Sequence, residues 1–280
     1  MPPFILISPA TRGLSLALTR HYLRTTSLPI FTTFRPNPPN SSGSGPDGPR
    51  TPESVREDIL GPLRDIDPAR LHLLPLDLTS EESIASAADA LGRALPQLPG
   101  PDAPSYIRTA FFTGGVLHPE RQPADLALDH ILETFRLNVV CHLLLIKHFS
   151  RFLPPASAST SAPSDPLTLA KWVHVSARVG SISDNRIGGW YSYRASKAAL
   201  NQVIRTFDLH LQAKKLHAMA VGVHPGTVKT DLSERFWRSV SAEKLFSPEY
   251  SAAKLAEVVD GLRADQRGKV WDWKGEEVEP

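Results

Sequence analysis

The chain has 280 residues, of which 41% are hydrophobic and 21% are charged, and its formal net charge is +2. This length supports one sizeable domain and is too short for two full ones. The near-neutral charge gives no electrostatic field of the kind that marks nucleic-acid or membrane binders, so neither partner is expected.

Cysteine and histidine usage narrows the class of protein further. The single cysteine, Cys141, excludes an internal disulfide, and its place in the apolar run 139–146 predicts a buried structural thiol. The ten histidines are scattered without metal-ligand spacing, so no metal site is expected. A strand begins almost at the first residue, which leaves no secretory signal, and no apolar run is long enough to cross a bilayer. A reducing, cytoplasmic location is therefore expected.

Short apolar runs alternate with segments of helical period along the chain. In chain order, the sequence predicts a strand at 4–7, a helix at 14–23, strands at 29–34 and 71–76, a helix from Ser80, a strand at 109–112, a helix around 129–152, a strand at 172–175, a helix around 191–214, a strand at 219–223, a helix around 248–263 and a strand at 269–273. This alternation predicts an α/β fold with a Rossmann-like, doubly wound parallel sheet in three α/β/α layers. Ligands of such a sheet collect at the carboxyl ends of its strands.

Two segments interrupt this alternation. Residues near 36–52 and 154–166 are rich in proline, serine and glycine and too poor in apolar residues to pack. We expect them to be flexible surface insertions into one dinucleotide-binding domain that spans residues 1–280.

Tyr193 and Lys197 carry the strongest chemical signal. They stand four residues apart at the start of the predicted helix 191–214, so they share one helix face. A free phenol loses its proton only near pH ~10, and a neighbouring ammonium favours the phenolate. The pair is therefore a candidate acid/base catalyst, although a chance pair on a solvated helix face has the same spacing.

The first predicted strand runs into a turn at 8–15 that precedes a helix. Such a turn lets a pyrophosphate approach the backbone at a helix N-terminus. Contacts to the pyrophosphate are expected from Ser8, Ala10, Thr11, Arg12, Gly13 and Leu14. Pro9 offers no amide hydrogen and Ser15 adds bulk against the sheet, so the turn by itself is a weak motif.

These motifs resemble the short-chain dehydrogenase/reductase family, whose fingerprint at the first turn is Thr-Gly-x-x-x-Gly-x-Gly. Only Gly13 of the three glycines is kept, with Pro9 and Ser15 at the other two places. Further landmarks follow in family order. The resemblance implies cofactor contacts from Asp77 and Leu78 at the adenine ring, from Thr113, Gly114 and Gly115 after the fourth strand, and from Pro225, Gly226, Thr227, Val228 and Thr230 over the nicotinamide. It also implies that Asn138 shapes the site and holds a proton-relay water.

The family also uses a serine that polarises the substrate carbonyl, and its usual place is occupied by Ala177. Ser176 precedes that place by one residue, and neighbours on a strand face opposite ways. We favour Ser176, which a bulged strand end would turn toward the site, over the loop residues Ser181 and Ser183. The stretch from Ser176 to Lys197 resembles the subgroup akin to C-factor and the sniffer-type carbonyl reductases.

Charge at the end of the second strand predicts the cofactor. An acidic residue there accepts hydrogen bonds from the ribose 2′-hydroxyl, whereas a basic residue accommodates a 2′-phosphate. The chain has Arg35 at this place and Arg12 in the first turn, so NADP(H) is expected over NAD(H). The alternative is that Arg35 only solvates the start of the insertion.

The expected function is that of an NADPH-dependent oxidoreductase acting on a carbonyl or alcohol substrate. The resemblance implies that Tyr193 supplies the proton, that Lys197 lowers the phenol pKa and binds the nicotinamide ribose, and that Ser176 polarises the carbonyl. An apolar substrate wall is expected from Phe112, Val116, Leu117, Trp190, Phe236 and Trp237. The resemblance also suggests a homodimer or homotetramer built through the helices at 129–152 and 191–214. The alternative function is a dinucleotide-binding signalling or scaffold protein without turnover.

Overall fold

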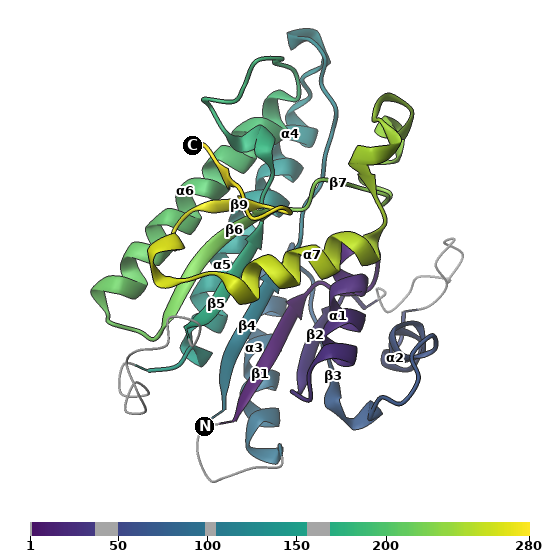
Figure 1. The fold of residues 1–280 in the computed structure, drawn as a ribbon, viewed down its shortest axis with the longest axis vertical. Helices are drawn as coiled ribbons and strands as arrows, with labels where there is room; N and C mark the ends of the chain where they lie inside the picture. Colours follow the sequence, from purple (N-terminus) through teal and green to yellow (C-terminus); the bar gives the residue numbers. More distant parts are fainter. Residues whose placement is uncertain (1, 37–49, 99–104, 156–168) are drawn as a thin grey trace.

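A twisted parallel sheet forms the middle layer of the computed structural model, which describes residues 2–36, 50–98, 105–155 and 169–280 (Figure 1). Within these residues eight strands pair in the order β10-β9-β6-β5-β4-β1-β2-β3, all parallel except the antiparallel edge strand β10. Their bounds are Pro3–Ser8 (β1), Ile30–Phe34 (β2), Leu71–Pro75 (β3), Tyr106–Phe112 (β4), Ala170–Val175 (β5), Ala218–His224 (β6), Val270–Asp272 (β9) and Glu277–Val278 (β10).

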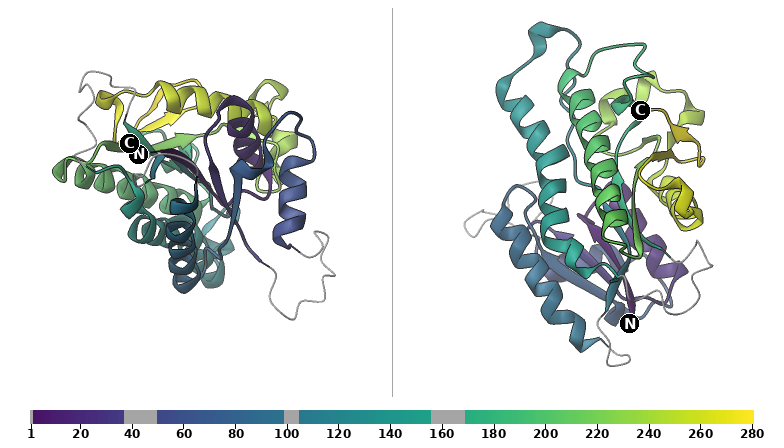
Figure 2. Two further views of the ribbon diagram at one scale, coloured as in Figure 1. Left: turned by 90° about the horizontal axis from the view of Figure 1, so that it is seen from below. Right: turned by 90° about the vertical axis from the view of Figure 1, so that its left-hand side faces the viewer.

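Helices cover both faces of this sheet (Figure 2). One face carries α1 (Gly13–Thr25), α2 (Pro52–Leu60) and α7 (Pro248–Gly261), and the other carries α3 (Glu81–Ala94), α5 (Cys141–Phe149) and α6 (Tyr191–Ala213). Each face has its own apolar cluster, with Leu18 and Leu255 in the first and Leu91 and Phe149 in the second. Burying one such side chain contributes about 1.5–3 kcal/mol. The predicted three-layer, doubly wound fold is confirmed.

The strands form where the sequence has continuous apolar runs because both faces of the sheet are covered. The four residues 4–7 of β1 are at most 1% exposed. Pro75, which lacks an amide donor, is tolerated because β3 is an edge strand and Pro75 is its last residue. Because these strands are parallel, their carboxyl ends lie along the same side of the sheet. The predicted site residues lie in or beside the segments that follow these strand ends.

The long helix predicted around 129–152 is interrupted. It consists of α4 (Leu128–Phe135), a π-helical segment over Arg136–Val140 and α5. Such π segments are frequent at functional sites. The segment contains Asn138, whose side-chain contacts are described below.

The two predicted insertions fall mostly outside the described residues, which omit 37–49 and 156–168. The first was expected to run to residue 52, but the described chain resumes at residue 50 and α2 begins at Pro52. Thr51 caps this helix, because its hydroxyl accepts the Ser54 amide at 3.2 Å. Nothing in the described part of the chain is a helix both apolar and long enough to span a bilayer.

Candidate active site

Tyr193 and Lys197 lie in the first two turns of α6, beside the carboxyl end of β5. The Lys197 ammonium is 5.7 Å from the centroid of the Tyr193 ring and donates to the carbonyl oxygen of Val175 at 2.9 Å. Lys197 is 3% exposed and Tyr193 is 8% exposed, so both groups are largely removed from water. The spacing of four residues therefore brings a phenol and an amine together at the ligand-binding edge of the sheet.

Burial, and not the neighbouring charge, dominates the acid–base properties of the pair. Burial raises the pKa of Tyr193 to about 12 and lowers the pKa of Lys197 to about 8. The lowered phenol pKa expected from the sequence is therefore not observed. The reason is that desolvation disfavours the phenolate, while the Lys197 ammonium is held by a backbone carbonyl. At neutral pH the Tyr193 phenol keeps its proton.

Asn138 ties the loop after β4 to α6. Its side chain is fully buried, accepts the Val116 amide at 2.8 Å and donates to the Val116 carbonyl at 3.0 Å and to Ser196 Oγ at 2.9 Å. Asn138 thus lies beside Lys197 and the loop after β4, and its side-chain amide forms hydrogen bonds to protein atoms. These hydrogen bonds hold two elements of the site in register.

Gly114 and Gly115 leave room at the end of β4 that no larger residue would leave. A Cβ atom on Gly114 would lie 2.6 Å from Leu78 Cδ1, and one on Gly115 would lie 3.1 Å from Asn138 Oδ1 and 3.6 Å from Lys197 Nζ. Thr113 fixes this loop against the first turn, since its amide donates to the Ser8 carbonyl at 2.8 Å and its hydroxyl to the Pro9 carbonyl at 3.2 Å. Gly114 and Gly115 therefore let this loop approach Leu78, Asn138 and Lys197 closely.

The turn between β1 and α1 presents the start of a helix without a cap. Arg12 is the N-cap residue, no side chain caps the helix, and the first turn of α1 has no acidic residue. Gly13 has a φ of +53°, which favours glycine, and a Cβ there would lie 2.9 Å from Thr230 Cγ2. Free amides at a helix N-terminus attract an anion. The Ala10 amide is excluded from this set because it donates to the Thr33 carbonyl at 3.0 Å.

Other predicted contacts of this turn differ in their surroundings. Ser8 Oγ is buried and bonded to Thr33 Oγ1 at 2.7 Å, so the Ser8 side chain supports the sheet. Leu14 packs against the core on the α1 face, while Thr11 is half-buried in the turn itself. Of the side chains in this turn, that of Arg12 is the exposed one, while Thr11 and Leu14 are half-buried.

Asp77 and Arg35 end neighbouring strands at the same edge. Asp77 Oδ1 accepts the amide and the hydroxyl of Thr79 at 2.8 and 2.7 Å, which leaves its other oxygen for a ligand. Burial pushes the pKa of Asp77 upward, but the hydrogen bonds from Thr79 and the charge of Arg35 outweigh it, so the pKa lies below its ordinary value. Arg35 is exposed and lies near enough to Asp77 to act on its charge.

The loop after β6 covers the first turn. It begins with Pro225 and with Gly226, whose φ is +74° and whose Cβ would lie 2.5 Å from Phe246. Thr227–Val228 then forms strand β7, which pairs with β8 (Leu245–Phe246). This small sheet directs Thr230 to Gly13 on α1, and Arg12 forms an exposed ion pair of 3.3 Å with Asp231. The structure thus brings the turn predicted to bind the pyrophosphate into contact with the loop predicted to lie over the nicotinamide.

The serine hydroxyls proposed from the sequence are all engaged elsewhere. Ser176 is 2% exposed and its hydroxyl donates to Asn201 Oδ1 at 2.5 Å. Ser181 Oγ and Ser183 Oγ donate to the carbonyl of Pro280 at 3.3 and 2.6 Å. β5 pairs regularly with β6 up to Val175, and the Ser176 hydroxyl is held by Asn201 on α6, so the structure favours a structural role for Ser176 over the predicted polarising role.

The chain was compared with protein families and with proteins of known function. No family model matches the chain. The chain is 40% identical over 194 residues to the 1-hydroxy-2-glutathionyl-2-methyl-3-butene dehydrogenase of Rhodococcus sp. (strain AD45), which covers 69% of this chain and 74% of that protein. It is also 34% identical over 110 residues to the C-signal of Myxococcus xanthus, which covers 39% of this chain and 61% of that protein.

The chain belongs to the short-chain dehydrogenase/reductase family. It is an NAD(P)-dependent oxidoreductase of that family, as the sequence predicted. Solved structures agree in fold. The carbonyl reductase Sniffer of D. melanogaster superposes with a TM-score of 0.75 at 23% identity, and the NADPH-bound carbonyl reductase from chicken fatty liver with a TM-score of 0.76 at 24% identity, each over 100% of both chains.

A dinucleotide fits the residues that this member of the short-chain dehydrogenase/reductase family presents. The uncapped amides of α1 suit a pyrophosphate, and the space at Gly114 and Gly115 is one that a Cβ atom would fill. Pro9 does not prevent this fit, because the amides of α1 begin four residues later.

The hydrogen bond from Ser176 to Asn201 gives a direct prediction. We expect Ser176→Ala to leave kcat/KM within about threefold of wild type. The same variant should lower the free energy of unfolding by about 1–3 kcal/mol, because Asn201 Oδ1 loses its buried donor. Ala177→Ser, at the family's usual serine place, is the matched variant and should raise kcat. Steady-state kinetics and urea denaturation of both proteins measure these effects. A 100-fold loss of kcat in a folded Ser176→Ala protein would restore the catalytic role.

Aromatic side chains border Tyr193 on the solvent side. Trp190 lies edge-on to Tyr193 at 6.1 Å between ring centroids and packs against Phe236 at 4.8 Å. These residues remain candidates for the apolar substrate wall, together with the half-buried Val116, Leu117 and Trp237. Phe112 does not belong to it, because this side chain is fully buried against Trp172 in the core.

A buried histidine pair behind the site was not anticipated. Trp172 Nε1 donates to His174 Nε2 at 2.9 Å, so His174 carries its hydrogen on Nδ1 and donates it to His142 Nδ1 at 2.8 Å. His142 Nε2 then donates to the Gly114 carbonyl at 3.1 Å. Both rings are fully buried and neutral, and burial lowers the pKa of His142 to about 3. The chain of donors supports the glycine loop from inside the protein.

The sequence holds a signal for this pair, although a weak one. His174 alternates with Trp172 on one face of β5, and His142 lies in an apolar helical run beside Cys141, which is fully buried as predicted. A polar residue in an apolar run requires a buried partner. The partner itself lies 32 residues away and cannot be identified from spacing alone.

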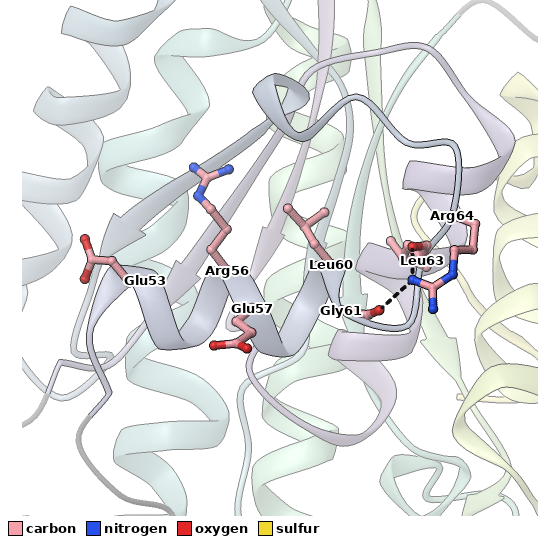
Figure 3. Close-up of a pocket in the computed structure, with 7 residues that line it drawn as sticks. All are labelled: Glu53, Arg56, Glu57, Leu60, Gly61, Leu63 and Arg64. Atoms are coloured by element: carbon pink, nitrogen blue, oxygen red, sulfur yellow. Dashed lines mark hydrogen bonds between the residues drawn. The ribbon is translucent and has the colours of Figure 1, made fainter.

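A surface hollow of about 510 Å³ lies apart from these residues, along α2 (Figure 3). It is lined by Glu53, Arg56, Glu57, Leu60, Gly61, Leu63 and Arg64. The guanidinium of Arg56 is committed to the carbonyls of Pro68 and Leu71 at 2.9 and 2.8 Å. Among the residues that line this hollow, Arg56 therefore has a structural role, and the lining residues do not form a catalytic group.

Proposed function

We propose that this enzyme reduces a carbonyl compound with NADPH, using Tyr193 as the proton donor. The observation that supports this most is the buried phenol, protonated at neutral pH, beside Lys197 and the space at Gly115. Reduction of a carbonyl requires a proton on the oxygen, and a neutral phenol can supply it. The related chicken carbonyl reductase is an NADPH-bound protein, which favours the same cofactor.

Each residue of the site has a definite part in this proposal. When bound, the nicotinamide cofactor supplies the hydride. Lys197 orients the ribose and holds a positive charge near Tyr193, while Asn138 keeps the loop at Gly115 in place. With Ala177 at the usual serine place, Tyr193 is the donor in the described structure best placed to polarise the carbonyl. We therefore propose electron-poor carbonyls, such as 1,2-dicarbonyls and quinones, as the first substrates to test.

The test is NADPH consumption, measured by absorbance, against a panel of aldehydes, ketones, 1,2-dicarbonyls and quinones. Turnover of at least one class supports the proposal. Tight NADPH binding, seen as quenching of tryptophan fluorescence, without turnover of any class would contradict it and favour a signalling or scaffold role.

Arg35 is proposed to select NADPH through its 2′-phosphate. Arg35→Asp should weaken NADPH binding about 10- to 100-fold, which corresponds to a lost charge-assisted hydrogen bond, and should change NADH binding less than about threefold. Arg24→Asp, with the same charge change at the far end of α1, is the control and should leave both affinities unchanged. Isothermal titration with each cofactor measures this. Equal losses for both cofactors would contradict the role of Arg35.

The proposal also includes the oligomeric state and the cellular location of the protein. Large apolar side chains are exposed on α4 and α5, with Leu128, Leu132 and Leu143 exposed by 69%, 58% and 47%. This supports a homodimer or homotetramer built through the predicted helices. The lone buried Cys141 is consistent with a reducing, cytoplasmic location. The single eight-stranded sheet with one apolar cluster on each face supports one domain across the chain.

A further inference from the structure

Helix α6, which carries Tyr193 and Lys197, begins without a side-chain cap from its own N-cap residue. Its N-cap residue is Trp190, in the left-handed conformation with φ 50° and ψ 49°, and no side chain of that residue caps the helix. Unsatisfied amides in a first turn are costly when they are buried. Ser192, the second residue of α6, is 4% exposed, so its amide cannot rely on water.

Glu120 supplies this cap from a distant part of the chain. Its carboxylate accepts the Ser192 amide at 2.8 Å through Oε2 and the Ser192 hydroxyl at 2.6 Å through Oε1. Its backbone carbonyl also accepts the Trp190 amide at 2.7 Å. The side chain is 2% exposed, and a carboxylate is almost never buried to this extent unless it is paired. A negative charge at a helix N-terminus is favourable.

The position of Glu120 relates this contact to the site. Glu120 lies in the loop that follows β4, and Asn138 holds the first part of the same loop through Val116. Ser192 immediately precedes Tyr193. The loop is therefore fixed at two points, one on the π-helical segment and one on the first turn of α6, and Gly115 lies close to the first of them, since a Cβ on it would be 3.1 Å from Asn138 Oδ1.

We propose that Glu120 is a positioning residue for catalysis, which fixes the first turn of α6 and with it the Tyr193 phenol. The inference rests on the proposed function of Tyr193. It adds a second anchor of the site, 72 residues from Ser192 in sequence, that acts through Ser192 and touches neither substrate nor cofactor. A misplacement of about 1 Å at a reacting group can lower a rate by 10²-fold.

The experiment compares Glu120→Ala and Glu120→Gln with Thr51→Ala, which removes the cap of α2, a helix on the opposite face of the sheet. Glu120→Ala should lower kcat at least about 10-fold and change the Kd for NADPH less than about threefold. Glu120→Gln keeps one acceptor for Ser192 and should recover most of kcat. Thr51→Ala should lower Tm and leave kcat unchanged.

Hydrogen exchange of the peptide that contains Ser192 gives a readout that needs no turnover. Exchange should be faster in Glu120→Ala than in wild type. This separates the two proposals, because a wild-type protein that reduces no carbonyl defeats the proposed function while the exchange still tests the contact. Ser192→Ala, which removes only the 2.6 Å hydrogen bond, replaces Glu120→Ala if that variant does not fold. Unchanged exchange, a kcat within twofold of wild type, or a loss of kcat shared by Thr51→Ala would overturn the inference.

Discussion

Replacing Tyr193 by phenylalanine is expected to lower kcat by about 10²- to 10⁴-fold, the usual contribution of a positioned acid or base. The hydroxyl is the only group removed, and the ring keeps its contacts with Trp190 and with the Lys197 ammonium. Cofactor binding should therefore change less than about threefold. Single-turnover NADPH oxidation and fluorescence titration measure the two quantities separately.

Tyr191 provides the matched control for this substitution. It stands two residues earlier on the same helix and is 42% exposed, so Tyr191→Phe should retain the wild-type kcat. A Tyr193→Phe enzyme with wild-type turnover would show that the proton comes from another group. Equal losses in both variants would show that the start of α6 had been disturbed, and the assignment of Tyr193 would lose its support.

Acid is expected to destabilise the protein through the buried histidine pair. Burial holds the pKa of His142 at about 3, against 6.5 for an exposed imidazole, so the unfolded chain binds more protons between these two values. The free energy of unfolding should therefore be unaffected by this group above pH 6.5. It should fall as the pH decreases toward 3, by roughly 5 kcal/mol in all. Protonation would also leave His142 and His174 with two donors facing each other.

The comparison of wild type with His142→Gln isolates this effect from the carboxylates that titrate at lower pH. A glutamine amide can accept from His174 and donate to Gly114, so the variant should fold and show a flatter dependence of stability on pH between 6.5 and 4. Urea denaturation across this range measures it. His210→Gln, at an exposed position of α6, should retain the wild-type slope. An unchanged slope in His142→Gln would show that the pair is not the acid-sensitive group.

The fold was largely predictable because its determinants are local. Continuous apolar runs such as 4–7 and 219–223 identify buried parallel strands, and the order of strands and helices then determines the layers. The π-helical segment at Arg136–Val140 was not predicted from the sequence, and its Asn138 contacts Val116, 22 residues earlier, which helical spacing does not reveal. Helix α2 was missed because its start at Pro52 directly follows a segment rich in proline and glycine.

The candidate site was predictable where residues follow a local motif, and not where burial or long-range contacts decide. The spacing of Tyr193 and Lys197 places the two groups together, but it contains no information on desolvation, which reverses the expected direction of the phenol pKa. The orientation of Ser176 is decided by Asn201, 25 residues later, and that of Ser192 by Glu120, 72 residues earlier. Such contacts follow from the assembled fold.

The most direct test of the account is a crystal structure of the protein with NADP⁺ bound. We predict that the nicotinamide ring lies over Gly115, with the Tyr193 hydroxyl facing its reactive carbon and the Lys197 ammonium bonded to the ribose. A nicotinamide bound elsewhere, or a Tyr193 hydroxyl turned away from the ring, would contradict the proposal that this pair is the catalytic centre.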